Sequence, residues 1–221
     1  MKYLLLLALF SCAHRDVTLT GSLNEMLVSD HSPIKGKTTG DKIHPTLKSE
    51  WMGKYWQLQG GSELLQDTEG ASSTVWFKLK DKNPAPQDFI ALSVGSVDKS
   101  LYSRFSIRTE NGQLMGVLRA GDSDQAQEMI TTGAGLRVGV WYNVTLTVDY
   151  SKNIAQIYLD GHKLETKGSV KFSQKKTAAT PSASMSIGAE DDGSNFFFEG
   201  EIRRVLIWKR VLSPEEIQQL Q

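Results

Sequence analysis

Alternating apolar and polar positions recur along the chain from Trp51 to its C-terminal end, most plainly in residues 73–80. The apolar set of that segment is Val75, Phe77 and Leu79. Successive side chains of a β-strand point to opposite faces of its sheet, so this set is predicted to face a core, with Trp76 and Lys78 facing outward. Similar segments follow at intervals of roughly 8 to 12 residues, separated by Gly, Asn, Asp and Pro, which is typical of a β-sandwich or barrel.

Two turns mark hairpins within this region. Asn111-Gly112 and Asp160-Gly161 are dipeptides that tolerate the positive φ angles of a type I′ turn, and a further strand is expected to begin at His162. Asn111-Gly112 is predicted to join strands at residues 101–109 and 113–120. A second hairpin is predicted at residues 141–150 and 154–160, joined by Ser151-Lys152-Asn153, and Asp160-Gly161 stands at its far end. The region is therefore predicted to be all-β.

One helix is expected, at the C-terminal end of the chain. Ser213 can cap it, Pro214 suits its first position, and Glu216 completes a capping box. Leu212 and Ile217 are spaced to form a hydrophobic staple across the N-terminus of the helix. We expect about two turns of helix that pack on the sandwich.

The first residues have the order of a secretory signal. In residues 1–11 a lysine precedes the apolar run 4–10, which is too short for a bilayer that needs about 20 apolar residues. Leu9-Phe10-Ser11-Cys12 resembles the lipobox at which bacterial signal peptidase II cuts before a lipid-modified cysteine, although the phenylalanine departs from that pattern. We predict lipidation of Cys12; the alternative is that Cys12 is an ordinary lone thiol.

The remainder divides into two parts. Residues 12–50 are rich in Ser, Thr, Lys, Gly and Pro, and are predicted to be a tether that contributes one early strand near residues 23–28. Residues 51–221 are expected to form one sandwich, long enough to bury a core without disulfides, which a single cysteine excludes. The 25 basic and 25 acidic residues balance, so the chain lacks the excess of positive charge typical of nucleic-acid-binding proteins.

Two blocks of sequence resemble the laminin-G-like jelly roll of the concanavalin A-like lectin/glucanase superfamily. In GVWYNVTLTVDYSKNIAQIYLDGHKLE a Trp precedes a strand, and the return strand ends in Asp-Gly. In MSIGAEDDGSNFFFEGEIRRVLIWKRVLSPEEIQQL, Ser-Ile-Gly and Phe-x-Gly-x-Ile strands lead to a Leu-Ser-x-x-Glu-Ile helix. The resemblance implies an all-β, two-sheet antiparallel jelly-roll sandwich with a short C-terminal helix. Relatives often have Asp at the position of Arg203. The resemblance therefore does not assign the role of that Asp to this chain.

The superfamily includes lectins, glycan hydrolases and adhesion modules, so its fold does not by itself give a function. Hydrolysis needs two carboxylates about 5 to 9 Å apart, which related glucanases present as Glu-x-Asp-x-Glu on a strand. The nearest approach here, Glu190-Asp191-Asp192, lies in a predicted loop without a third acid. No Gly-x-Ser-x-Gly elbow is present, and the four histidines lack metal-ligand spacing. Binding is therefore favoured over catalysis.

Calcium is the one cofactor that the sequence suggests. Members of the superfamily often hold an ion at the rim of the sandwich through carboxylates and loop carbonyls. Two predicted loops could supply such oxygen ligands, one with Asp122 and Asp124 and the other with Glu190, Asp191 and Asp192. The alternative is that both loops are solvated acidic turns.

A candidate ligand-binding patch follows from the outward positions of two strands. Tyr102, Arg104 and Arg108 stand opposite the core positions of their strand, and Trp76 is outward on its own. Aromatic rings pack on the apolar face of sugars, and guanidinium groups pair with carboxylate or sulfate, so such a patch would suit an acidic glycan. The alternative is that loops or the C-terminal segment cover these side chains.

These observations favour one function and leave two others open. The favoured function is a lipid-anchored binding module at the cell surface or in the periplasm, with a glycan or a cell-wall or surface partner. Ala13 after the cysteine suggests the outer membrane of a Gram-negative bacterium. The alternatives are a glycan hydrolase with an unrecognised site, and a structural or assembly lipoprotein that binds a protein partner through its edge strands.

Overall fold

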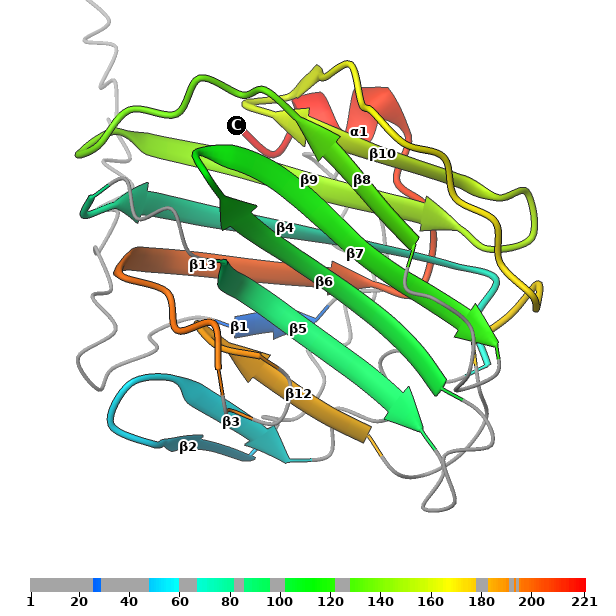
Figure 1. Ribbon diagram of the computed structural model, residues 1–221, viewed down its shortest axis with the longest axis horizontal. Coiled ribbons are helices and arrows are strands. Elements are labelled where there is room, and N and C mark those ends of the chain that lie inside the picture. Colours follow the sequence, from blue (N-terminus) through cyan, green and yellow to red (C-terminus); the bar gives the residue numbers. More distant parts are fainter. Residues whose placement is uncertain are drawn as a thin grey trace, which may run out of the picture.

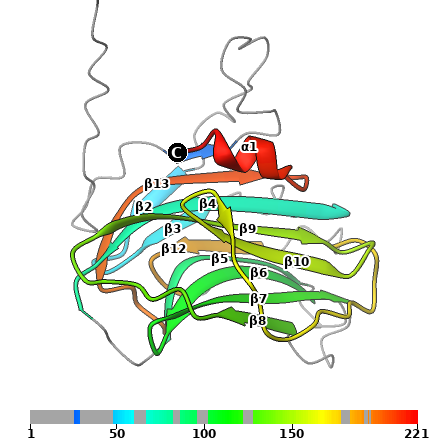
Figure 2. The ribbon, with the colours of Figure 1, turned by 90° about the horizontal axis from the view of Figure 1, so that it is seen from above.

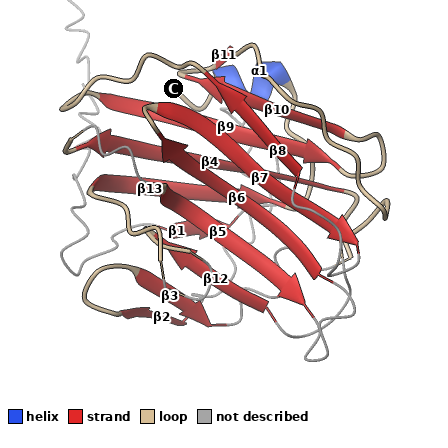
Figure 3. Ribbon diagram, viewed as in Figure 1, coloured by secondary structure: helices blue, strands red, loops and turns tan. Residues whose placement is uncertain are grey.

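The computed structural model of the chain is a sandwich of two β-sheets with one short helix (Figures 1 and 3). It describes residues 26–28, 48–59, 67–81, 86–95, 102–121, 128–177, 183–190, 193 and 195–221. Neighbouring strands are antiparallel except for one parallel pair at an edge. The predicted two-sheet sandwich with a C-terminal helix is therefore confirmed.

The first sheet has six strands, and β4, the segment with the clearest alternation in the sequence, lies inside it. Its order is β1 (Met26–Val28), β13 (Gly200–Trp208), β4 (Gly70–Leu79), β9 (Trp141–Asp149), β10 (Ile154–Leu159) and β11 (His162–Lys163). In β4 the alternate apolar side chains all face the core, as predicted from their period of two. The parallel edge pair is β1 with β13, and β1 lies within the apolar stretch of the expected tether.

The second sheet has seven strands. Its order is β2 (Lys48–Trp51), β3 (Trp56–Gln59), β12 (Ala183–Ile187), β5 (Gln87–Gly95), β6 (Tyr102–Glu110), β7 (Gln113–Gly121) and β8 (Glu128–Thr132). Both predicted type I′ turns carry positive φ angles at their two residues, 51° and 71° at Asn111-Gly112 and 47° and 72° at Asp160-Gly161. The first turn joins β6 to β7, and the second joins β10 to β11 of the six-stranded sheet. The predicted hairpin of residues 141–150 and 154–160 is the antiparallel pair of β9 and β10, so both hairpins are confirmed.

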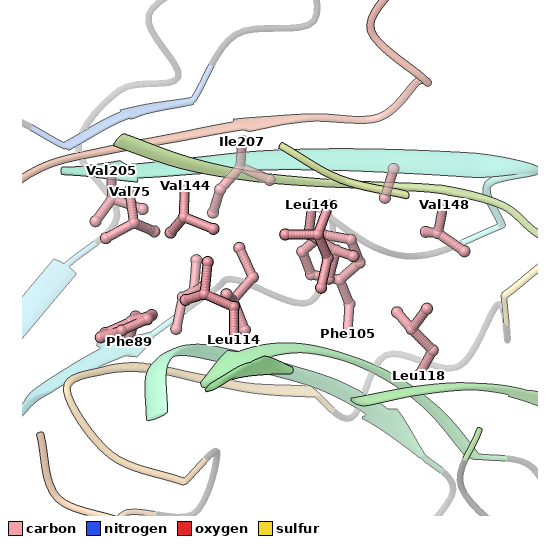
Figure 4. Packing of buried hydrophobic residues seen from close by; sticks show 14 of the residues in the cluster. Val75, Phe89, Phe105, Leu114, Leu118, Val144, Leu146, Val148, Val205 and Ile207 are labelled. Carbon is pink, nitrogen blue, oxygen red and sulfur yellow. The ribbon is translucent and has the colours of Figure 1, made fainter. Parts of the chain in front are cut away.

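The core lies between the two sheets (Figure 4). Side chains of β4, β9 and β13 meet those of β5, β6 and β7 across it, and the largest fully buried ones include Phe77, Phe89 and Phe105. The rings of Phe77 and Phe89 stack with centroids 4.2 Å apart, one from each sheet. This aromatic contact fixes the sheets to each other close to the rim where β4 ends.

The helix α1 (Pro214–Gln218) packs on the outer face of the six-stranded sheet, away from the other sheet (Figure 2). The predicted capping box is present, because the Ser213 hydroxyl accepts from the Glu216 N–H and the Glu216 carboxylate accepts from the Ser213 N–H. Under the helix lies a second apolar cluster, formed by Trp76, Tyr158, Leu206, Trp208, Leu212, Ile217 and Leu220. In the described part of the chain no helix is long and apolar enough to span a membrane.

Candidate functional site

A groove lies at one rim of the sandwich, where β4 ends and β13 begins. Its volume is about 710 Å³, within the range of roughly 300–1,000 Å³ that small-molecule sites occupy. The charged side chains that line it are Lys54, Lys78, Lys80, Glu199 and Glu201. Apolar surface comes from Leu79, Val138, Phe197 and Phe198. Cations, carboxylates and apolar surface thus meet in one hollow.

The ring of Phe197 forms one half-buried wall of the groove. The ammonium group of Lys54 lies 4.8 Å from its centroid, and the ring of Tyr55 lies at 6.0 Å. The attraction between a cation and the face of an aromatic ring positions the Lys54 charge beside apolar surface. A ligand with an apolar face and a negative group would meet both features together.

Lys78 connects the groove to the outer face of the six-stranded sheet. Its ammonium group lies 2.6 Å from Glu201 Oε1 and 5.1 Å from the centroid of the Trp141 ring. The three residues are cross-strand neighbours on one face, since Lys78 is in register with both of the others. This row places an indole ring directly beside the rim.

Glu199 and Glu201 are the two carboxylates of the groove. They are two positions apart in the chain, and Glu201 is engaged by the Lys78 ammonium group. The exposed Glu199 donates its backbone N–H to Gln87 Oε1 at 3.0 Å. Glycoside hydrolysis requires one carboxyl group to act as an acid and its partner to be a free base or nucleophile. Glu201 is held by Lys78, and among the described residues no ion pair engages Glu199.

The wall that carries Phe197 belongs to the connection between β12 and β13, which is fastened to the beginning of β5. Three hydrogen bonds make this attachment, in which the N–H groups of Gly188, Asp88 and Glu199 donate to Phe89 O, Phe196 O and Gln87 Oε1. Within the connection, Gly193 has a φ of 71°, and a Cβ there would overlap the Tyr55 ring. The glycine therefore permits the close approach that closes the wall.

A buried charge cluster lies on the outer face of the seven-stranded sheet next to this attachment. Asp88 is fully buried, and its carboxylate oxygens lie 3.6 Å from the guanidinium groups of Arg104 and Arg108. The Ser106 hydroxyl donates to Asp88 Oδ1 at 2.8 Å. Arg104 also pairs with Glu190 at 3.2 Å. Both arginines are therefore engaged by acids of their own chain.

Burial raises the pKa of Asp88 from 3.8 to about 7, and Glu190 acts in the same direction. Arg108, Arg104 and the Ser106 hydroxyl lower the pKa, but the desolvation of the carboxylate outweighs them. The ion-pair distances of 3.6 Å are longer than those of charged hydrogen bonds, which limits what the guanidinium groups contribute. Asp88 therefore changes its charge near neutral pH.

The predicted ligand-binding patch is only partly assembled. Arg104 and Arg108 do come together, and Arg108 stacks on the Phe196 ring at 4.9 Å, but both side chains are buried. Trp76 belongs to the other sheet and is 7% exposed, as a member of the apolar cluster under α1. The prediction that Trp76 shares a patch with the arginines is wrong, because the outer faces of the two sheets point in opposite directions. The side chain of Tyr102 is outside the described ones.

The structure brings no calcium site together in the residues that it describes. Asp122, Asp124, Asp191 and Asp192 lie outside those residues, as does Cys12. Glu190, the one described member of the proposed ligand sets, pairs with Arg104. In the described ranges, no group of three or more metal-ligating side chains is close enough to hold an ion.

Sequence reasoning missed the groove because its members are far apart in the chain. Lys54 precedes β3, Lys80 follows β4, and Phe197 lies in the connection before β13. One local signal was present in the run FFFEG, where the Phe-x-Gly-x-Ile pattern requires only Phe198. A further phenylalanine with no core position to fill is a candidate for a ligand contact.

The sequence profile described as "Concanavalin A-like lectin/glucanases superfamily" matches residues 53–218. No curated protein matches the chain.

Several solved structures share the fold at low sequence identity. The CBM40 domain of the Ruminococcus gnavus IT-sialidase, bound to α2,3-sialyllactose, aligns with a TM-score of 0.55 at 18% identity, over 70% of this chain and 83% of that one. A NanB sialidase from Streptococcus pneumoniae aligns with a TM-score of 0.53 at 18% identity, over 69% of this chain and 24% of that one. The binding domain of botulinum neurotoxin serotype D aligns with a TM-score of 0.50 at 16% identity, over 75% of this chain and 39% of that one. These similarities concern the fold.

Proposed function

Because the chain belongs to the concanavalin A-like lectin/glucanases superfamily, we propose that it is a carbohydrate-binding module without catalytic activity, whose rim groove holds a glycan with acidic groups. The observation that carries the proposal is the groove itself, in which the Phe197 ring lies beside the Lys54 ammonium group. An aromatic ring packs against the apolar face of a sugar, while a neighbouring lysine pairs with a carboxylate or sulfate.

Charge and fold support an acidic ligand. Lys78 is neutralised by Glu201, so among the described residues that line the groove Glu199 is the remaining carboxylate beside Lys54 and Lys80. The R. gnavus module that shares the fold was solved with a sialylated glycan, which is acidic. The absence of an assigned acid and base pair favours retention of a glycan over its cleavage.

Binding to a glycan array tests the proposal. We expect the purified protein to retain acidic glycans in preference to neutral ones, with or without calcium. Phe197→Ala and Lys54→Ala should each weaken binding roughly tenfold, which corresponds to about 1.4 kcal/mol for one lost stacking or charge contact. Lys176→Ala is the matched control, since that exposed lysine contacts Asp67 at the opposite rim.

Two results would contradict the proposal. Binding to no glycan on the array would remove its basis. Measurable cleavage of a glycan that is abolished by Glu199→Gln would assign the groove to a hydrolase instead.

The location of the module is a further part of the proposal. A lipid on Cys12 would tether the domain to a membrane, and Ala13 after it is compatible with the outer membrane of a Gram-negative bacterium. We expect Cys12→Ser to move the protein from the membrane fraction to the soluble fraction, and to abolish incorporation of radiolabelled palmitate. A variant that stays with the membrane would show that something else anchors the chain.

A further inference from the structure

Two rows of side chains lie on the outer face of the six-stranded sheet, between the groove and α1. The row nearer the groove consists of Glu201, Lys78 and Trp141, and the next consists of Arg204, Trp76 and Asn143. Neighbouring strands lie about 4.8 Å apart, so each row is roughly 10 Å wide, and the rows are separated by about 7 Å along β4. The Asn143 amide, which donates to Leu220 O at 3.4 Å, marks the border with the C-terminal segment.

Arg204 is the unusual member of the second row. Its guanidinium carbon lies 5.0 Å from the centroid of the Trp76 ring, so the charge is positioned over the indole by a cation–π contact. Among the described residues no carboxylate pairs with Arg204, and its buried Nε–H donates no hydrogen bond. A guanidinium with five donors and no acid partner is suited to an anionic oxygen from outside the chain.

The two rows are continuous with the groove. Lys78 and Glu201 line the groove and also form part of the first row, and the half-buried Trp141 ring stands between the rim and the interior of the sheet. A sugar chain that leaves the groove along the outer face would meet the Trp141 ring first and the Arg204 guanidinium next. Lys78 is already paired with Glu201, so among the described side chains of the two rows Arg204 is the cation without a carboxylate partner, and it can meet a second acidic sugar.

On the basis of the proposed function, we propose that Arg204 is a second anion subsite, and that the module recognises an acidic oligosaccharide running from the groove past Trp141 to Arg204. The ligand is then an acidic sugar chain longer than a disaccharide, because a single sugar or a disaccharide fills only the groove. The length of the sugar chain therefore determines affinity.

Disialic and hexasialic acid are the probes that test this inference, measured by isothermal titration calorimetry on the purified protein. The unchanged protein should bind hexasialic acid at least tenfold more tightly than disialic acid. Arg204→Gln, which removes the charge and keeps most of the side chain, should abolish that difference and leave disialic acid binding unchanged. Trp141→Leu should reduce the difference in the same way. Lys176→Gln, a remote loss of one positive charge, should change neither affinity.

The possible outcomes separate the inference from the proposed function. If Arg204→Gln, with an unchanged melting temperature, binds both probes as the unchanged protein does, Arg204 is not a subsite and the groove alone binds. If Phe197→Ala lowers both affinities while Arg204→Gln lowers only that for hexasialic acid, both proposals stand. If the unchanged protein binds neither probe but retains another acidic glycan on the array, the inference fails and the proposed function stands; if it also binds no glycan on the array, both fail.

Discussion

Replacing Phe77 by alanine is expected to lower the free energy of unfolding by about 3–5 kcal/mol, the usual cost of a large cavity at a buried phenylalanine. Phe77 is fully buried, and its ring stacks on Phe89 of the opposite sheet at 4.2 Å and meets the edge of Phe198 at 6.3 Å. Removal of the ring takes away the aromatic contact between the sheets. A domain with a total stability of roughly 5–15 kcal/mol would lose a large part of it.

Urea denaturation followed by tryptophan fluorescence measures this loss. Phe77→Leu should cost less, because leucine fills part of the cavity, and Val138→Ala is a surface control that should stay within about 0.5 kcal/mol. Val138 is 44% exposed at the same rim. A loss below about 1 kcal/mol for Phe77→Ala would mean that the core closes over the vacated space and that the stack is not what joins the sheets.

The Phe77 substitution should also reduce glycan binding. Phe198 packs edge-on against both Phe77 and Phe89, with centroids at 6.3 and 4.9 Å, and is itself part of the groove. The core aromatic cluster therefore supports the wall that carries Phe197.

Features of the fold that depend on neighbouring residues could be predicted from the sequence. The period of two in β4 identified its core-facing side chains, and the positive-φ dipeptides identified both hairpin turns. The capping box at Ser213 was equally predictable, since its two hydrogen bonds join residues three positions apart. In each case the physical cause lies within a few residues of its effect.

The candidate patch failed where distant strands had to be placed relative to each other. Alternation showed that Trp76 and Arg104 both point away from the core, but it carries no information about which sheet contains each strand. Since β4 and β6 belong to opposite sheets, their outward residues cannot share a surface. Alternation also could not show that Asp88 would be buried between the two arginines.

The groove depends even more on tertiary structure. Three of its charges, those of Lys54, Lys80 and Glu199, come from separate parts of the chain, and its wall is positioned by hydrogen bonds to the start of β5. The motif Phe-x-Gly-x-Ile located the strand that begins there but not the hollow beside it. Arg204 illustrates the same limit, because only the arrangement of the strands beside it shows that no described carboxylate pairs with it.

Asp88 is expected to make the protein less stable as the pH rises through the neutral range. In the unfolded chain its carboxyl group titrates near 3.8, and in the folded protein burial raises the pKa to about 7. Between these values the folded state binds more protons than the unfolded state, so stability falls with increasing pH. At 1.36 kcal/mol for each pKa unit, the shift from 3.8 to about 7 corresponds to about 4 kcal/mol in the free energy of unfolding. About 2–3 kcal/mol of this is lost between about pH 5 and pH 8.

Asp88→Asn should remove this dependence, because asparagine keeps the shape and the hydrogen bond with Ser106 but does not titrate. The groups that face it are Arg104, Arg108 and Glu190, and Glu190 is paired with Arg104. Urea denaturation at about pH 5 and pH 8 gives the change in the free energy of unfolding between the two pH values. That change should be about 2–3 kcal/mol smaller in the variant than in the unchanged protein. Other titrating groups are common to both proteins and cancel in the comparison. If both proteins show the same change with pH, Asp88 is ionised throughout this range, and its attraction to the two guanidinium groups exceeds the cost of burying its charge.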